Sequence, residues 1–165
     1  FELATVIGDT ISSLRPQFKR TPWEIEIDVA PEILMDSFPG PLEQIVINLV
    51  TNSIRHGFEG RDHGCVRIVG RSQSPGWVTL LVVDDGIGIS PARLGRVFDP
   101  FFTTKSVGNG TGLGLAIVKH ILGRHQATLD IRSTPGKGSR FAARFPPRRV
   151  APPMPTTETA DRTRA

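Results

Sequence analysis

The sequence is poor in three features that would each indicate a particular class of protein: cysteine, tyrosine and long apolar runs. Cys65 is the only cysteine among 165 residues, so the chain can form neither an internal disulfide nor a zinc cluster built on cysteines. No apolar run approaches the roughly 20 residues that a membrane-spanning helix needs, and no signal peptide is visible. We therefore expect a cytoplasmic domain with no membrane contact of its own, either free-standing or the cytoplasmic part of a membrane-bound receptor.

The chain is basic, with a formal charge of +4 at neutral pH. Five arginines lie in the last predicted strand and the segment after it: Arg144, Arg148, Arg149, Arg162 and Arg164. A basic chain can bind nucleic acid, but no basic run here is interleaved with aromatic residues. We therefore expect no nucleic acid among its partners.

Residue periodicity predicts alternating helices and strands. Helices are predicted where apolar residues recur at helical spacing, at 2–15, 42–56 and 112–123, with a short helical piece at 90–97. Pro16 and Pro22 are expected to end the first helix. Strands are predicted at 23–29, 65–71, 78–83, 127–133 and 140–145. Turn residues at 74–76 and 135–138 predict two hairpins.

These elements predict an α/β fold, a two-layer sandwich of a mixed β-sheet with three main helices on one face. The predicted domain covers residues 1–146, a length that suits a single core. Residues 147–165 are rich in proline and contain no aromatic residue, which is typical of a disordered tail or linker.

The helix predicted at 42–56 carries a polar stripe opposite its apolar face. Gln44, Asn48, Asn52 and Arg55 fall within this stripe, and His56 flanks it. Asparagine is a mediocre helix former, so two asparagines one turn apart suggest a function. The helix alone is explained equally well by a solvated polar face. An amide oxygen suits Mg²⁺, and an arginine supplies charge for a phosphate.

Two glycine motifs follow this helix. Asp84-Asp85-Gly86-Ile87-Gly88 comes directly after a strand, where a carboxylate could accept a hydrogen bond from adenine N6, although a simple Asp-Gly turn is the alternative. Gly108 to Gly114 opens a helix whose amides and dipole make an anion site; the alternative is a flexible loop ending at an N-cap, Thr111. No Gly-Lys-Ser/Thr follows, and no strand precedes, so neither a Walker nor a Rossmann site fits.

An aromatic segment, Phe98 to Lys105, lies between the glycine motifs. Its three phenylalanines would be costly to expose, so we expect them to pack on the domain or on a partner. Lys105 is placed to reach a terminal phosphate, with a solvated lysine as the alternative.

Together these motifs resemble the catalytic, ATP-binding domain of bacterial two-component sensor histidine kinases, in the superfamily of DNA gyrase, MutL and the large heat-shock chaperone. Four ordered motifs carry the resemblance: an N box (Gln44 to His56), a G1 box (Asp84 to Gly88), an F box (Phe98 to Lys105) and a G2 box (Gly110 to Leu115). The short spacing between the last two resembles the nitrogen- and oxygen-sensing subclass. The likeness covers about residues 1–146.

The resemblance implies roles for the N box and the F-box lysine. Asn52 would ligate Mg²⁺, and His56 would lie against the nucleotide. Asn48 and Arg55 would lie near the phosphates, and Lys105 would contact the γ-phosphate. The implied catalytic residues are therefore Asn48, Arg55 and Lys105.

The resemblance also implies how the glycine motifs hold ATP. Asp84 would bind adenine N6, while Gly86 and Gly88 would let the purine approach the backbone. The segment 90–111 would be a mobile ATP lid with Phe101 and Phe102 as docking points. The phosphates would be cradled by the residues of the G2 box, which are Gly110, Thr111, Gly112, Leu113 and Gly114.

Two departures define the expected reaction. Hydrolytic relatives carry a glutamate at the position of Asn48, and an amide cannot accept a proton from an attacking water, which favours phosphotransfer. The acceptor histidine is also missing, because no histidine here lies in the helical His-Glu/Asp context of the family; the histidines are His56, His63, His120 and His125.

The implied protein is a homodimer in which this domain transfers the γ-phosphate of ATP to a histidine on an upstream dimerisation domain, for relay to a response regulator. Two alternatives stay open: a protein serine kinase of the same superfamily, such as an anti-sigma factor, and a nucleotide-binding interaction module without transferase activity.

Overall fold

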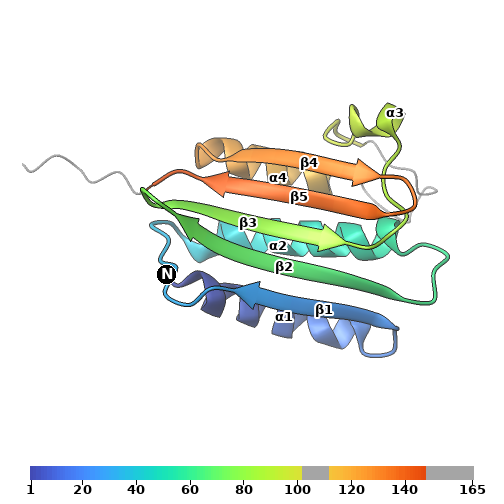
Figure 1. Ribbon diagram of the computed structural model, residues 1–165, viewed down its shortest axis with the longest axis horizontal. Helices are drawn as coiled ribbons and strands as arrows, with labels where there is room; N and C mark the ends of the chain where they lie inside the picture. Colours follow the sequence, from blue (N-terminus) through green and yellow to red (C-terminus); the bar gives the residue numbers. More distant parts are fainter. Residues whose placement is uncertain (102–111, 148–165) are drawn as a thin grey trace, which may run out of the picture.

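The computed structural model describes residues 1–101 and 112–147, which form a five-stranded sheet covered by helices on one face. The strands are β1 (Trp23–Val29), β2 (Gly64–Gln73), β3 (Trp77–Asp84), β4 (Thr128–Thr134) and β5 (Gly138–Phe145). The helical elements are α1 (Leu3–Phe18), α2 (Pro39–Asn52), the π-helical turn η1 (Ser53–Gly57), α3 (Pro91–Leu94) and α4 (Gly114–Arg124). Figure 1 shows α1, α2 and α4 behind the sheet, with the short α3 apart from them. The predicted sandwich is confirmed.

The sheet is mixed, in the order β1-β2-β3-β5-β4. β1 runs parallel to β2, with Ile25 opposite Val66, and the other three pairs are antiparallel. A parallel pair needs a crossover connection, which α2 provides between β1 and β2. This crossover lays α2 along the sheet and brings its C-terminal end to the same end of the molecule as the end of β3 (Figure 1).

Strand alternation and helix periodicity build the core between the two layers. On β3, Val78, Leu80 and Val82 are buried, while the residues between them are only half-buried. The apolar face of α2 packs on them through a run of residues spaced at helical intervals: Leu42, Ile45, Val46, Leu49 and Val50. None of the described helices is long and apolar enough to cross a membrane.

Two helix boundaries differ from those predicted. α1 continues through Pro16 to Phe18, so the expectation that this proline ends the helix is wrong. Pro16 lacks the N–H that would bond to the preceding turn, but its fixed φ fits a helix, and the loss falls near the end of α1. α2 begins at Pro39, three residues before the predicted start, because proline is well accommodated in a helix's first turn.

An aromatic corner joins the end of η1 to the start of the sheet. Phe58, which is 1% exposed, stacks on Trp23 with ring centroids 4.9 Å apart. Gly64 is the cross-strand partner of Trp23 and lies directly against the Phe58 ring. Only a residue without a Cβ fits there, because an added Cβ would lie 2.6 Å from Phe58.

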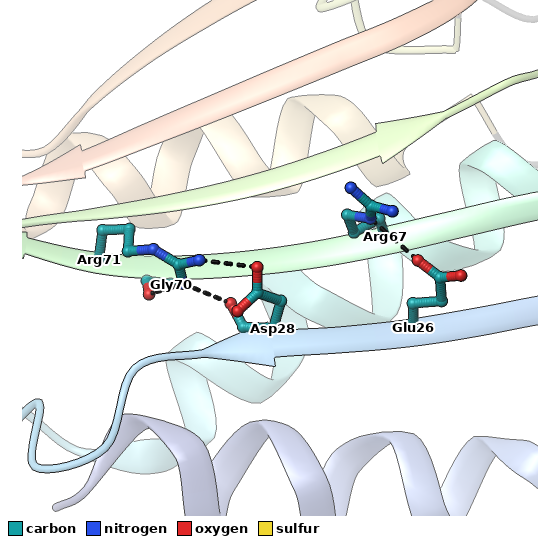
Figure 2. Close-up of polar contacts among 5 residues, drawn as sticks. All are labelled: Glu26, Asp28, Arg67, Gly70 and Arg71. Atoms are coloured by element: carbon teal, nitrogen blue, oxygen red, sulfur yellow. Dashed lines mark hydrogen bonds and ion pairs between the residues drawn. The ribbon is translucent and has the colours of Figure 1, made fainter.

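Ion pairs link β1 and β2 on the face of the sheet that carries no helix, as Figure 2 shows. Arg67 donates through Nε to Glu26 at 2.9 Å, and Arg71 donates through Nη2 to the Asp28 carboxylate at 2.7 Å. Arg71 also donates to the carbonyl oxygens of Asp28 and Gly70. These side chains are exposed, so water screens the pairs and they add little stability. Their arrangement nevertheless matches the register of the parallel strands.

The aromatic corner generates a stability prediction. Gly64→Ala should lower the free energy of unfolding by about 1–3 kcal/mol, because the added methyl overpacks the confined Phe58 ring. Gly8→Ala is the matched control: no heavy atom lies within 4 Å of its added Cβ, so this substitution within α1 should be neutral or stabilise by up to about 1 kcal/mol. Urea denaturation followed by tryptophan fluorescence measures both. Unchanged stability of Gly64→Ala would contradict the confinement of the ring.

Candidate functional site

An open pocket lies where β3 ends, bounded by η1, the glycine loop that follows β3, the segment around α3 and the first turn of α4. It encloses about 660 Å³, counting the open solvent at its mouth. Twelve residues line it: Asn52, Ser53, His56, Gly57, Asp84, Ile87, Gly88, Ile89, Arg93, Val97, Leu115 and Ser139. The pocket therefore brings together residues of the predicted N box, G1 box and G2 box. It also includes Arg93 and Val97, which precede the F box.

The end of α2 supplies one wall of the pocket through a change in helix geometry. From Ser53 the helix widens into a π-helical turn, a feature that occurs frequently at functional sites. Asn52 and His56 line the pocket, as do Ser53 and Gly57, each pair separated by four residues. The predicted placement of Asn52 and His56 on one side of this helix is therefore observed, although its last turn is not α-helical.

Asp84 is the buried acid of the pocket, with 6% of its surface exposed. Its Oδ2 accepts a hydrogen bond from Ser53 Oγ at 2.8 Å, and its Oδ1 accepts one from the Gly86 N–H at 2.9 Å. Burial raises the pKa of this carboxyl, and the hydrogen bonds from Ser53, Gly86 and the backbone of Ser139 oppose that rise. These three donors fix the carboxylate at the pocket wall, where it can accept one further hydrogen bond.

The glycines of the G1 box let two stretches of backbone come together. A Cβ at Gly86 would lie 2.4 Å from the carbonyl oxygen of Gly57, and one at Gly88, whose φ is +75°, would lie 2.3 Å from that of Thr134. Between them, Ile87 donates to the Gly57 carbonyl at 2.8 Å and accepts from Gly136 at 2.7 Å. The loop is thus held between the end of η1 and the β4–β5 hairpin.

Apolar side chains cover the other walls of the pocket: Ile87, Ile89, Val97 and Leu115. Phe98 packs against the core, and Lys119 Nζ lies 5.4 Å from its ring centroid. Phe101, expected as a docking point of the lid, is instead 73% exposed. Of the two phenylalanines of this segment that the structure describes, Phe98, with Val97 beside it, is therefore the one that anchors the segment to the domain.

Asn48 lies beside the pocket rather than in its lining. Its side-chain oxygen approaches the first residue of α4, where a Cβ added to Gly114 would be 3.7 Å away. Its amide nitrogen is buried and has no hydrogen-bond partner within the described residues. A buried N–H donor without a partner is costly, so this atom is suited to an acceptor that residues 1–101 and 112–147 do not supply.

The remaining predicted residues divide into two groups. Arg55 is exposed and does not line the pocket. Gly112 adopts a φ of +69°, and its Cα packs on the backbone of Phe101. Leu113 immediately precedes α4. Lys105, Gly110, Thr111 and Phe102 lie outside the described residues, as does the predicted tail after Pro147. Their implied roles stay predictions.

Sequence reasoning missed three polar residues of the site, namely Ser53, Arg93 and Ser139, the last of which contacts Asp84 through its backbone. Ser53 was assigned to the buried face of the helix, where its hydroxyl needs a partner, and that need was the available signal for the contact with Asp84. Arg93 carries no such signal, because an exposed arginine in a short helix is ordinary, and only the fold brings it to the pocket.

The sequence matches the family described as "Histidine kinase-, DNA gyrase B-, and HSP90-like ATPase" over residues 39–149. It is 40% identical over 131 residues to the phosphate regulon sensor protein PhoR of Pseudomonas aeruginosa, covering 77% of this chain and 29% of that protein. It is also 40% identical over 119 residues to the sensor histidine kinase ZraS of Escherichia coli K12, covering 72% of this chain and 24% of that protein. The chain thus spans under a third of each relative.

Solved structures share this architecture, and one of them is a sensor histidine kinase. The mycobacterial sensor histidine kinase MprB superposes with a TM-score of 0.75 at 25% identity, covering 91% of this chain and 97% of that one. Full-length ShkA, solved in complex with AMPPNP, gives a TM-score of 0.76 at 26% identity, covering 93% of this chain and 32% of that one.

The two superpositions cover 91% and 93% of this chain. The family match alone covers more than half of the chain, from the first turn of α2 to beyond β5. The chain therefore belongs to the histidine kinase-, DNA gyrase B- and HSP90-like ATPase family, as an ATP-binding catalytic domain of the sensor histidine kinase type.

Proposed function

We propose that this domain binds MgATP in its pocket and presents the γ-phosphate to a histidine on an upstream dimerisation domain of a longer protein. Relay from that phosphohistidine to a response regulator would follow. The supporting observation is Asp84, a buried carboxylate oriented by Ser53 and Gly86 at the wall of a largely apolar pocket. Such a wall suits a flat purine whose exocyclic amine needs one acceptor.

The residues at the pocket fit both ATP and Mg²⁺. Asn52 lines the pocket and offers an amide oxygen, a ligand that a hard cation accepts. The amide nitrogen of Asn48 is buried and has no partner among the described residues, and the same side chain approaches Gly114 through its oxygen, so a phosphate oxygen is the proposed acceptor for the nitrogen. Arg55, Lys105 and the G2-box residues are the proposed further phosphate contacts. Bound Mg²⁺ would neutralise charge on the transferred phosphoryl group.

The proposed contribution of the chain's own residues is positioning. Asp84 would fix the purine and Asn52 the metal–phosphate end, so that the γ-phosphorus is held in line with an approaching imidazole nitrogen. The bond from nitrogen to phosphorus forms as the bond to the ADP oxygen breaks. Asn48 cannot take a proton from water, which favours transfer over hydrolysis.

The proposed whole protein is a homodimeric sensor kinase, with this domain in the cytoplasm. That proposal is supported by the similarity of this chain to the sensor proteins PhoR and ZraS, of which it spans under a third. A protein serine kinase of the same superfamily and a non-transferring nucleotide-binding module are the other candidates, and they become outcomes of the experiments below.

Replacing Asn52 by alanine should weaken Mg-dependent ATP binding about tenfold or more. Even the loss of a residue that only hydrogen-bonds to a metal ligand commonly lowers metal affinity or activity about 10–100-fold. Gln44→Ala is the matched control, because Gln44 lies on the exposed side of α2 and does not line the pocket. Isothermal titration with and without Mg²⁺ measures the effect, and circular dichroism confirms the fold. Unchanged MgATP affinity in Asn52→Ala would remove this residue from the metal site.

Asp84 should select adenine over guanine, because guanine presents an acceptor where adenine N6 donates. Asp84→Asn should lower ATP affinity about tenfold or more, since a hydrogen bond to a charged group contributes about 1.5–3 kcal/mol. Wild-type affinity should also fall as the pH drops through the raised pKa of Asp84, because protonation removes that charge. Asp85→Asn is the control, since Asp85 accepts from the Cys65 N–H and does not line the pocket. Equal wild-type affinities for ATP and GTP would exclude the assignment.

The chain by itself should bind ATP without labelling itself or hydrolysing ATP appreciably. Adding the upstream dimerisation domain should restore labelling from γ-labelled ATP, on a histidine of that domain. The product should be acid-labile and alkali-stable, as a phosphoramidate is.

Three outcomes would contradict this prediction. An acid-stable phosphoserine would indicate the serine kinase, and binding without transfer to any supplied acceptor would indicate the interaction module. Rapid hydrolysis by the isolated chain would contradict the role given to Asn48.

A further inference from the structure

Arg93 lines the pocket, and no described residue forms an ion pair with its guanidinium. It lies in α3, is exposed, and lines the pocket together with Val97. Within residues 1–101 and 112–147, its guanidinium makes no ion pair and no side-chain hydrogen bond. Arg96, three residues on, behaves differently: it pairs with Asp99 at 3.6 Å and does not line the pocket.

The lining of the pocket indicates which part of a nucleotide Arg93 would meet. Asp84, the proposed adenine acceptor, lies in its wall. Of the described polar residues assigned to the metal and phosphates, Asn52 lines it, while Asn48 and Arg55 do not. Arg93 therefore shares its wall with the proposed adenine acceptor, Asp84, and with the glycine loop that follows β3.

We propose that Arg93 is a further nucleotide-binding residue whose guanidinium stacks on the outer face of the purine. The inference rests on the proposed nucleotide binding. Ile89, Val97 and Leu115 give the base apolar walls, and the exposed side chain of Arg93, which lines the same pocket, can cover the remaining face. A guanidinium is planar and weakly hydrated, so it can lie flat on an aromatic face, whereas a strongly hydrated ammonium group meets such a face only as a point charge.

The test is titration of the full 165-residue chain with AMP, ADP and ATP in the presence of Mg²⁺. Arg93→Ala should weaken all three by the same factor, about three- to tenfold, because the base is common to them. Arg93→Lys should not restore affinity, since it keeps the charge but loses the plane. Arg96→Ala, the control from the same segment, should bind like the wild type.

Two results would overturn the inference while leaving nucleotide binding intact. Wild-type affinity in Arg93→Ala would mean that the side chain is simply solvated. A loss that grows from AMP to ATP, and that lysine rescues, would mean that Arg93 contacts phosphate. Failure of the wild type to bind any of the three nucleotides would instead refute the proposed function itself, and the inference with it.

Discussion

The carboxylate of Asp84 is the point at which three separate parts of the chain meet. It ends β3, accepts a hydrogen bond from Ser53 on the π-helical turn, and accepts another from Gly86 in the glycine loop. Burial disfavours its charge, and these donors offset that cost. Losing either donor would leave a buried acceptor unsatisfied and free the pocket wall to move, so the shape of the site depends on this small network.

Local patterns were sufficient to predict most of the fold. Strict alternation predicted β1 at Trp23–Val29 with its observed bounds, and the apolar face of α2 is buried as its periodicity indicated. The order of motifs along the chain was enough to identify the pocket. Asn52, His56, Asp84 and Gly88 do meet there, because the parallel crossover carries the end of α2 to the end of β3.

What the sequence could not reveal depends on contacts between distant segments. The tertiary fold tolerates Pro16 inside α1 and widens α2 at Ser53, and a wheel drawn at a constant 100° cannot anticipate either change. Gly86 and Gly88 were explained by the approach of a purine, yet their Cα atoms pack on the carbonyls of Gly57 and Thr134, far away in sequence.

β1 has a further consequence for how such domains coexist at high concentration. It is the outermost strand on its side of the sheet, so its free backbone groups could template a strand from another molecule. Glu24, Glu26 and Asp28 project from it, and copies aligned edge to edge would bring like charges together. Charged side chains on an edge strand discourage such pairing, and here the repulsion between copies is lessened because Arg67 and Arg71 pair with Glu26 and Asp28.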